Sequence, residues 1–435
     1  MHIREKRGTY FFYIVFGLIP LLLWLWAVWP LSFSSISTTA GLLARVLGVI
    51  GVCFYAGNLL LSGRYKFFDR LFYGLDKLYD FHYRMGKIAL YLLLGHVALI
   101  LYNVYQDTLW DIVKFFFDFT YIQLTLGKIA IVGMAAVIVN TIFFSKRYSY
   151  EWLKHIHIYL GAFFFVGATH AYLIGSDIGR FQPLRWFVLT LLVLAFMSWI
   201  WRTVLRKWLA YHSKAIVTAV TDLNGLVTEV VMKPQHPVVF KAGQFMFVRF
   251  IQKGFPNEDH PFSITASPQE GQLRISAKAV GDFTQTLKTL KPGATALIQG
   301  PFGGFVYSAA THKKQIWIAG GIGITPFIGM ARALRDAQAT EYSIDLFFSV
   351  QREQDWVFKS EFEQIMQQLP GFRVHFWLPS RDGFISMTAI QNMVSLAEKS
   401  VFICGPAGMM DALIDQAKKL GISSHNIHSE LFRLL

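Results

Sequence analysis

The segment from Glu151 to Ile174 reads EWLKHIHIYLGAFFFVGATHAYLI, and it sets the interpretation of the whole chain. It exceeds the roughly 20 residues that a helix needs to cross a hydrocarbon core. It also carries three histidines, at positions 155, 157 and 170. Because polar side chains at membrane depth are costly, these histidines indicate a functional site.

Five further apolar runs precede Leu209, so the sequence predicts six membrane-spanning helices. The chain of 435 residues is 54% hydrophobic and 16% charged, which excludes an ordinary soluble protein. The first run follows a basic start but lacks a small-residue cleavage site, so we expect an uncleaved helix. The five runs are Tyr10–Trp29, Gly41–Leu61, Asp80–Tyr105, Gly127–Phe144 and Leu184–Leu205.

Basic residues are concentrated in alternate connections, which predicts the orientation of the helices. The start, the second and fourth connections and the exit hold thirteen Lys and Arg residues, whereas the other three connections hold Lys114 and Arg180. The positive-inside rule therefore puts both termini on the cytoplasmic side of a cell membrane, as in a bacterium. The formal net charge of +14 then lies beside anionic lipid, and we expect no nucleic-acid partner.

Histidines occur in spaced pairs on the third and fifth predicted helices. His82 and His96 are fourteen positions apart, which is about 21 Å along a helix and returns to nearly the same face. His157 and His170 are thirteen positions apart, about 19 Å. Imidazole is an axial ligand of haem iron. Two stacked bis-histidine haems are therefore predicted, with His82 and His157 on the inner side and His96 and His170 on the outer side.

Helix geometry leaves an alternative for the inner ligand. Thirteen residues of a straight helix rotate by roughly 220°, whereas the fifteen from His155 to His170 return within about 60°. This favours His155, unless a bend or a π-bulge restores His157. Intramembrane histidines are also commonly packing residues. A different class of function, a proton or ion pathway, would use these histidines with Arg45 as relay groups.

The pattern changes near Trp208–His212 to that of a soluble chain. Period-two alternation in Ile216–Val220, Val227–Val231 and Leu273–Ala277 predicts a small antiparallel barrel. From Lys314 onward strands alternate with helices, which predicts a doubly wound parallel sheet. Its first strand enters the turn Gly320-Gly-Ile-Gly-Ile-Thr-Pro326, which suits a pyrophosphate because glycines let the backbone approach closely.

The membrane half resembles the ferric reductase and NADPH oxidase transmembrane family. The resemblance is carried by the segments Asp80-Phe-His-Tyr-Arg-Met-Gly86 to Gly95-His96 and Trp152-Leu-Lys-His-Ile-His-Ile-Tyr159 to Thr169-His170. In that family the paired ligands are fourteen apart on the third helix and thirteen apart on the fifth. The resemblance thus implies His82, His96, His157 and His170 as haem ligands, with His155 as the alternative inner ligand.

The soluble half, from His212 to Leu435, resembles the ferredoxin–NADP reductase family. Five motifs occur in that family's order: Ala242-Gly-Gln-Phe245, His260-Pro-Phe-Ser263, Gly281-Asp-Phe-Thr284, Gly300-Pro-Phe-Gly303 and Cys404-Gly-Pro406. The resemblance implies that FAD is held by His260, Pro261, Phe262, Ser263, Gly281, Asp282, Phe283, Thr284 and Phe432. It implies that the nicotinamide nucleotide is held by Gly320, Gly321, Gly323, Thr325, Pro326, Arg352, Cys404, Gly405 and Pro406.

Some of these residues have particular roles by the same resemblance. Phe262 would pack on the isoalloxazine ring, and Ser263 would lie near its reactive nitrogen. Phe432 would cover the flavin where nicotinamide enters. Arg352 follows a strand where the family reads the adenosine ribose, and a cation there would favour the 2′-phosphate of NADPH over NADH.

The prediction is a six-helix transmembrane dihaem bundle (1–209), an FAD-binding antiparallel β-barrel (210–310) and an NAD(P)H-binding α/β doubly wound domain (311–435). Nicotinamide releases two electrons at once and haem iron accepts one, so a flavin must stand between them. Two cysteines, Cys53 and Cys404, are too few for a cysteine-bound iron–sulfur cluster, so FAD should reduce the inner haem directly.

The external acceptor has several candidates. Similarity to bacterial NADPH oxidases favours oxygen, giving superoxide, with a ferric chelate as the alternative and a quinone or periplasmic protein as a third. A haem-free flavin reductase tethered by its helices is a further possibility. We find no calcium-binding loop or docking segment and expect no obligatory protein partner.

Overall fold

The computed structural model describes residues 2–31, 35–105, 108–144, 150–174, 177–209, 211 and 213–430. These residues form two compact units. The helical unit comprises Lys6–Phe72 and Lys77–Trp208, and the sheet unit consists mainly of the chain after Trp208. Each unit is described by itself.

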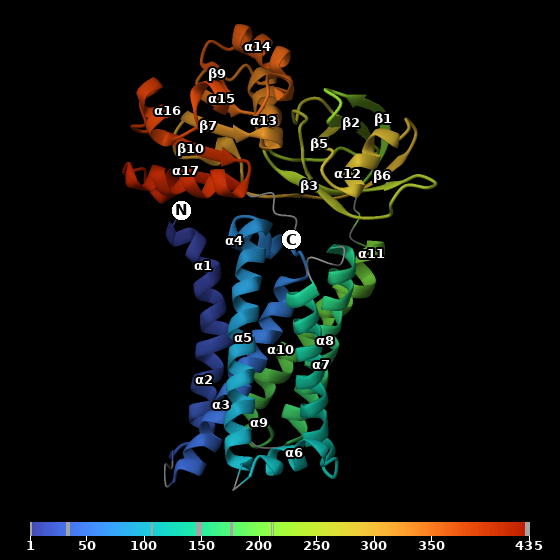
Figure 1. Cartoon of the computed structure of the whole chain (residues 1–435), viewed down its shortest axis with the longest axis vertical. Coiled ribbons are helices and arrows are strands. Elements are labelled where there is room, and N and C mark those ends of the chain that lie inside the picture. Colours follow the sequence, from blue (N-terminus) through green and yellow to red (C-terminus); the bar gives the residue numbers. More distant parts are fainter. Residues whose placement is uncertain are drawn as a thin grey trace. The chain divides into compact units, whose positions relative to one another are not determined.

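The helical unit contains six helices that are long and apolar enough to cross a membrane, which confirms the predicted number of spans. They run side by side in a bundle (Figure 1). The spans are Arg7–Ala27, Ile36–Leu61, Lys77–Val104, Ile122–Thr141, His155–Leu173 and Gln182–Leu205. The elements that form them are α1 (His2–Tyr13), the π-helical turn η1 (Ile14–Leu18), α2 (Ile19–Ala27), α3 (Ile36–Leu61), α5 (Leu75–Val104), α7 (Ile122–Phe144), α8 (Tyr150–Leu173), α10 (Gln182–Ile200) and the π-helical turn η2 (Trp201–Leu205).

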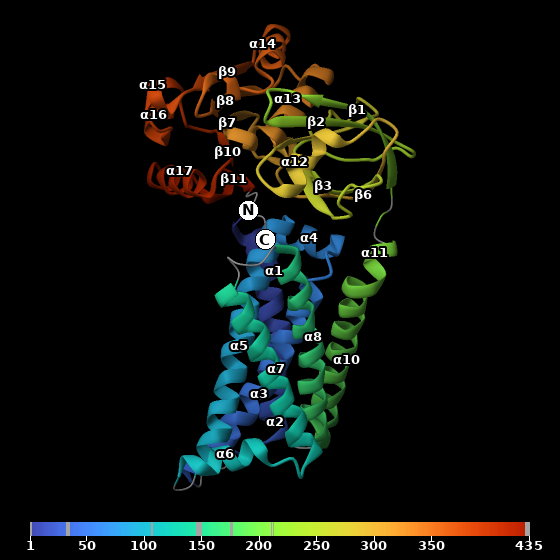
Figure 2. The ribbon, with the colours of Figure 1, turned by 45° about the vertical axis from the view of Figure 1, so that its right-hand side comes forward.

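Short helices complete the helical unit. They are α4 (Lys66–Phe72), α6 (Leu109–Phe117), α9 (Asp177–Arg180) and α11 (Arg206–Leu209). Helix α6 lies across one end of the bundle (Figure 2). It follows α5 and precedes α7, so it marks the outer end in the predicted orientation.

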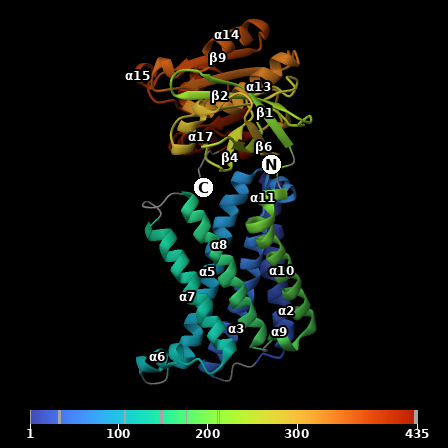
Figure 3. The same ribbon diagram turned by 90° about the vertical axis from the view of Figure 1, so that its right-hand side faces the viewer.

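Glycines allow the spanning helices to approach closely. Helices α7 and α8 lie side by side (Figure 3). An ideal Cβ at Gly133 of α7 would lie 2.2 Å from the ring of Phe163 in α8, so a larger residue would force the two helices apart. Gly161 of α8 has the same relation to Trp199 of α10, at 2.3 Å. Because lipid is as apolar as these side chains, close van der Waals packing of this kind holds membrane helices together.

The first sheet of the sheet unit has six antiparallel strands. Its order is β4–β3–β6–β1–β2–β5. After β4 the Thr265 N–H donates to the Arg274 carbonyl in β5 at 2.9 Å, which brings the two edges of the sheet together as the barrel prediction requires. The strands are β1 (Ser213–Asp222), β2 (Val227–Pro234), β3 (Phe245–Ile251), β4 (His260–Ser263), β5 (Leu273–Lys278) and β6 (Thr295–Phe302).

The second sheet has five parallel strands in the order β11–β10–β7–β8–β9. Chain order reverses between β7 and β10, so their carboxyl ends form the switch point at which doubly wound folds bind ligands. The strands are β7 (Lys314–Gly320), β8 (Ser343–Ser349), β9 (Phe372–Trp377), β10 (Ser400–Cys404) and β11 (Ile427–Glu430). The α/β doubly wound prediction is confirmed.

Helices cover both faces of this parallel sheet. Trp317 of β7 is fully buried in the cluster that includes α13 and α14, whereas the neighbouring Ile316 is fully buried in the cluster with α16 and α17. The helical elements of the sheet unit are α12 (Asp282–Thr286), α13 (Thr325–Asp336), α14 (Lys359–Gln368), α15 (Pro379–Asp382), α16 (Met387–Met393), α17 (Ala407–Lys419) and single 3-10 turns η3 (Leu287–Thr289), η4 (Tyr307–Ala309), η5 (Gly321–Ile324), η6 (Glu353–Asp355) and η7 (Ser424–Asn426).

Candidate functional site

Three of the four predicted haem ligands have a defined tautomer. The Nδ1 atom of each lies within hydrogen-bond distance of a main-chain carbonyl oxygen, which can only accept, so Nδ1 carries the proton. This leaves Nε2 with its lone pair free, the form in which histidine binds a metal. The bonds are His82 to Asn58 at 3.1 Å, His96 to Ala44 at 2.7 Å and His170 to Gln123 at 2.6 Å.

Glycines make room for two of these rings. An ideal Cβ at Gly48 of α3 would lie 3.0 Å from Nδ1 of His96, and one at Gly127 of α7 would lie 2.9 Å from Nδ1 of His170. A side chain at either position would push the imidazole away from the carbonyl that orients it. The two rings are therefore seated in grooves that only glycine leaves open.

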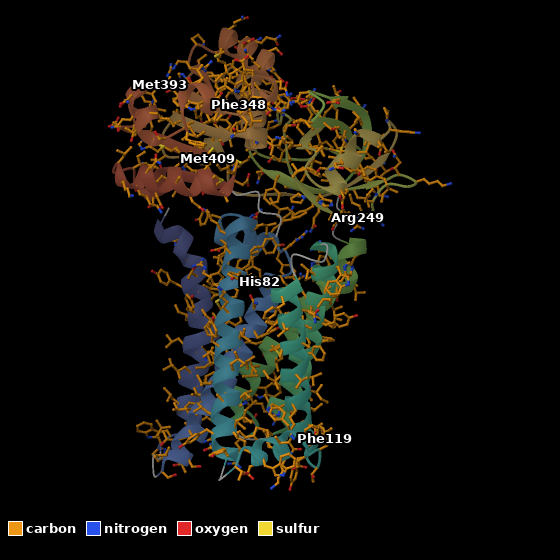
Figure 4. All side chains as sticks on the ribbon, viewed as in Figure 1. His82, Phe119, Arg249, Phe348, Met393 and Met409 are labelled. Atoms are coloured by element: carbon orange, nitrogen blue, oxygen red, sulfur yellow. The ribbon has the colours of Figure 1, made fainter. Side chains whose placement is uncertain are left out.

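The inner pair has the spacing of two ligands that share one metal. The ring centres of His82 and His157 are 6.4 Å apart. A metal–imidazole bond of about 2.0 Å plus about 1.1 Å from nitrogen to ring centre, taken twice, gives about 6.2 Å between ring centres across one metal. His155, the alternative ligand, is exposed. The donors present thus fit an iron porphyrin, and His157 rather than His155 lies beside His82, which is labelled in Figure 4.

The outer pair is held by different neighbours. His96 bonds to the Ala44 carbonyl of α3 and lies against Gly48 of the same helix. His170 leans on α7 through Gln123 and Gly127, whereas His157 faces α5. The two histidines of α8 therefore leave the helix in different directions, as the rotation of roughly 220° requires.

Two charged contacts of the helical unit were not predicted from the sequence. Arg202, counted only as an inner-face charge, lies close enough to His82 and His157 to act on both electrostatically. Its charge would pair with anionic groups of a porphyrin held there. Such contacts join residues far apart in sequence, so no spacing signal reveals them.

The second contact is an ion pair that involves Arg45. Arg45 Nη1 lies 2.8 Å from Asp177 Oδ1, and Trp24 Nε1 donates to Asp177 Oδ2 at 2.7 Å. Asp177 is only 8% exposed. Arg45 is thus bound to a carboxylate, and three histidines are bound to main-chain carbonyls rather than to one another. This arrangement favours metal ligands over a relay of histidines.

Three of the nine predicted nucleotide residues, Gly320, Gly321 and Pro406, line a cavity of about 610 Å³ at the switch point. Residues from the ends of β7, β8 and β10 line it, together with Asn224, Val227 and Lys278 from the antiparallel sheet. The cavity therefore lies between the two sheets, where a nucleotide could reach a flavin. Its other lining residues include Ile322, Ser349, Val350, Gln351, Asp355 and Met409, of which Met409 is labelled in Figure 4.

Close backbone contacts explain the glycines of this turn. An ideal Cβ at Gly323 would lie 2.3 Å from the Cys404 carbonyl oxygen, and one at Gly405 would lie 3.0 Å from the Gly320 nitrogen. The Thr325 hydroxyl donates to the Ile322 carbonyl at 3.0 Å, and α13 begins there with Pro326 in its first turn. The turn thus brings the predicted residues of β7 and β10 together with the start of a helix, which suits a pyrophosphate.

Arg352 lies differently from the expectation. Its guanidinium pairs with Asp355, with Nη2 at 3.1 Å from Oδ1 and Nε at 3.3 Å from Oδ2. Asp355 lines the cavity, whereas Arg352 is not among its lining residues. A carboxylate in this position accepts hydrogen bonds from ribose hydroxyls and repels a 2′-phosphate.

The predicted FAD residues lie on β4 and around α12. The His260 ring stacks on Phe283 with centres 3.7 Å apart, and His260 Nε2 lies 2.9 Å from a Glu258 carboxylate oxygen. Phe262 is buried 6.3 Å from Phe283, and Pro261 is exposed. The Thr284 hydroxyl accepts from the N–H groups of Val280 and Gly281 at 3.0 Å each, and Asp282 begins α12.

Two buried polar atoms beside this region fit a bound flavin. The Ser263 hydroxyl and Gln299 Oε1 have no hydrogen-bond partner within the described part of the chain. Both residues are at least 94% buried, so unmet polar atoms there are costly unless a ligand satisfies them. Phe432 lies outside the described residues.

Three protein-family models match separate parts of the chain. They describe a ferric reductase like transmembrane component over residues 47–168, an FAD-binding domain over 212–306 and an oxidoreductase NAD-binding domain over 317–415. The matches follow the order of the units and sheets described above.

Curated relatives are similar to the sheet unit. The ferredoxin–NAD(P)+ reductase component of the naphthalene 1,2-dioxygenase/salicylate 5-hydroxylase systems of a Ralstonia species is 25% identical over 230 residues, 50% of this chain and 68% of that protein. NADH-cytochrome b5 reductase 1 of Ajellomyces capsulatus is 29% identical over 184 residues, 39% of this chain and 59% of that protein. The chain thus spans between 59% and 68% of the length of these two relatives.

Solved structures show the same partial likeness. A cytochrome P450 reductase of Amycolatopsis matches 51% of this chain and 69% of its own, with 25% identity and a TM-score of 0.44. The FAD/NAD-binding domain of Vibrio cholerae nitric oxide dioxygenase matches 50% of this chain and 98% of its own, with 20% identity and a TM-score of 0.45. Both scores lie below 0.5, so the family models and the strand orders identify the domains. The chain joins a ferric reductase-like transmembrane domain to FAD-binding and NAD-binding domains of the ferredoxin–NADP reductase type.

Proposed function

We propose that this chain, a multi-pass membrane NAD(P)H oxidoreductase, passes electrons through FAD and two b-type haems to an acceptor on the far side of the membrane. Oxygen, reduced to superoxide, is the first candidate acceptor. The observation that carries the proposal is the inner histidine pair, whose ring centres are 6.4 Å apart within a chain that also carries FAD- and NAD-binding domains.

The cofactors would supply the redox chemistry, and the protein would supply their placement. When bound, FAD accepts two electrons from nicotinamide and haem iron carries one at a time. His82, His157, His96 and His170 would hold the irons through Nε2. The carbonyls of Asn58, Ala44 and Gln123 fix three of these rings and make them more basic ligands.

The sheet unit would bind the nucleotide and present it to the flavin. The Gly320–Gly323 turn and the start of α13 would hold the pyrophosphate with main-chain N–H groups. The Ser263 hydroxyl would meet a polar atom of the flavin ring, since it has no other partner among the described residues. The position of Asp355 supports NADH as a donor at least as good as NADPH.

A second acceptor, a ferric chelate, is favoured by the transmembrane match itself, which describes a ferric reductase like component over residues 47–168. Superoxide-dismutase-sensitive dye reduction, measured beside ferric chelate reduction with the same preparation, distinguishes the two. In either case the positive-inside distribution supports cytoplasmic termini and an external acceptor.

A haem spectrum and two histidine variants test the electron route. The full chain reduced with NADH or NADPH should show b-type bands at about two haems per chain. His96→Ala or His170→Ala should leave nucleotide-to-flavin transfer intact and stop external reduction. External reduction that continued unchanged in both variants would refute the route. A preparation without haem after porphyrin loading would instead support a tethered flavin reductase or an ion pathway.

A further inference from the structure

Helix α13 links the predicted nucleotide turn to the backbone that follows the predicted flavin strand. It begins at Thr325, directly after the glycine turn. At Gly329 an ideal Cβ would lie 2.5 Å from the Ile264 carbonyl oxygen, so only glycine lets the helix and this segment meet. Ile264 directly follows Ser263 at the end of β4. One helix therefore contacts the supports of both predicted cofactors.

Arg332 bonds α13 to the antiparallel barrel at this contact. Its side chain is 5% exposed. It donates from Nη1 to the Thr265 carbonyl at 2.9 Å and to Glu229 of β2 at 3.3 Å. On the other side Nε and Nη2 both donate to the Glu361 carboxylate of α14, at 2.7 Å each. A single guanidinium thus connects the barrel with two helices of the nucleotide-binding sheet.

The surrounding charges form a closed network rather than a ligand site. Arg274 pairs with Glu270 at 2.7 Å and with Glu229 at 3.5 Å, and Arg335 pairs with Glu361 at 3.4 Å. With Arg332 these are three cations and three anions around one polar hollow, and Arg335 also pairs with Asp336 at 2.8 Å. Because each of these charges is paired with another side chain, they favour a structural connection over binding of a charged ligand.

The backbone of α14 is strained where it meets Arg332. Phe358, the residue before α14, has a φ of +64°, which bulky residues rarely adopt. Its ring centre lies 5.4 Å from the Arg332 guanidinium carbon, within cation–π range. Burial alone would raise the pKa of Glu361, but the hydrogen bonds and charge of Arg332 hold that pKa below its usual value. The pair is therefore charged at neutral pH.

We propose that Arg332 is a positioning residue for electron transfer from nucleotide to flavin, because it fixes α13 and its glycine turn against the Thr265 backbone. This inference rests on the proposed function. In that step a hydride would pass from the nicotinamide ring to the flavin ring: one C–H bond would break and one N–H bond would form, so that the nucleotide would be oxidised and FAD reduced. The reacting atoms must lie about 3–3.5 Å apart, and an error of about 1 Å costs about 100-fold in rate.

Rapid mixing of the full-length FAD-loaded protein with NADH, without oxygen, tests this role. Flavin bleaching at several NADH concentrations separates the limiting rate from the nucleotide Kd. Arg332→Met removes both hydrogen bonds to the barrel, and Gly329→Ala forces α13 away from the Ile264 carbonyl. Both should lower the limiting rate about 10-fold or more while Kd changes less than about 3-fold. Arg332→Lys keeps the positive charge but lacks the planar guanidinium with its several N–H donors. Its limiting rate should therefore lie between that of Arg332→Met and that of the wild type.

Two matched variants serve as controls. Lys313→Met removes one positive charge, as Arg332→Met does, from an exposed ion pair with Glu341, and should change the rate less than about 2-fold. Glu361→Gln leaves both bonds to the barrel in place and should change it less than about 3-fold. If Arg332→Met does not fold, Gly329→Ala decides the question, because it disturbs the same contact between α13 and the barrel.

A limiting rate within about 3-fold of wild type in folded Arg332→Met and Gly329→Ala would overturn the role of Arg332. Slowing that came entirely from a weaker Kd would overturn it too, since that would be a binding effect. Wild-type protein whose flavin bleached with neither NADH nor NADPH would overturn the proposed function and this inference together.

Discussion

Replacing Gly127 should remove the outer haem while leaving the inner one in place. An ideal Cβ at this position would lie 2.9 Å from Nδ1 and 3.0 Å from Cε1 of His170. Ordinary contacts are about 3.5–4.0 Å, so the imidazole must move by about 0.5–1 Å. That movement works against its 2.6 Å bond to the Gln123 carbonyl.

The expected effect can be stated as haem affinity. Overpacking of this kind costs about 1–3 kcal/mol, which is about 5- to 150-fold in affinity. Gly127→Ala should lower the content to below about two haems per chain, and Gly127→Val to about one, as measured by pyridine haemochrome after purification. Alanine and valine do not weaken the helix relative to glycine, so loss of α7 is not a competing cause.

Gly179→Ala is the matched control, because nothing lies within 4 Å of an ideal Cβ there. It should keep both haems and their spectrum. If Gly127→Val kept about two haems per chain with an unchanged reduced spectrum and unchanged redox potentials, the reasoning that seats His170 in this groove would be refuted.

Two further predictions concern the sheet unit. Asp355→Ser should raise the ratio of kcat/KM for NADPH to that for NADH about 10-fold or more, because it removes the repulsion of a 2′-phosphate and frees Arg352. Steady-state kinetics with both donors measures this ratio. An unchanged ratio would show that Asp355 does not face the ribose. Burial would raise the pKa of Asp345, but hydrogen bonds from His375, Arg373 and Lys399 outweigh it and hold the pKa well below its usual value. The stabilisation is thus present above the ordinary Asp pKa of about 3.9 and is lost as pH falls through the lowered folded-state pKa. Asp345→Asn should cost about 3 kcal/mol at pH 7 and progressively less in acid, as thermal melts at several pH values would show; an equal cost at every pH would contradict this linkage.

Hydropathy and motif order predict the architecture because each depends on local sequence. Bilayer thickness fixes the length of an apolar run, so six runs give six spans within a few residues. The glycine turn after β7 likewise predicts the point at which the strand order of the parallel sheet reverses. The strand order of the antiparallel sheet depends on pairing between distant segments, and no local pattern contains it.

The choice between His155 and His157 shows where helix arithmetic misleads. The rotation of roughly 220° between His157 and His170 is right, because His157 faces α5 and His170 leans on α7. The preference for His155 assumes that both predicted ligands leave α8 from one face. The positions of α5 and α7 around α8 decide this, and one helix's sequence does not contain them.

Pairs formed across long sequence distances are equally hidden. Asp177 lies 132 positions from Arg45, and Glu229 lies 103 positions from Arg332. Even the pair of Arg352 and Asp355, three positions apart, is ambiguous in sequence. An exposed arginine beside a carboxylate can bind a ligand, or it can form an ion pair with that neighbouring carboxylate. The structure assigns it to the neighbour.

Helix α3 provides no predicted ligand, yet it orients one ring of each predicted pair of haem ligands. The carbonyls of Ala44 and Asn58 accept the Nδ1 protons of His96 and His82, and they are fourteen positions apart, the same interval as the two histidines. Because this interval of about 21 Å on α3 matches the interval between the two histidines, one rigid helix can orient both imidazole rings at their two depths. Every residue has a main-chain carbonyl, so the sequence of α3 does not reveal which carbonyls accept from the histidines. Gly48 is the exception in this helix, because it gives the His96 ring its space. Apart from those at Gly48, substitutions along α3 that keep its backbone straight should therefore leave both rings oriented, whereas a proline that bent α3 between Ala44 and Asn58 should disturb both haems together.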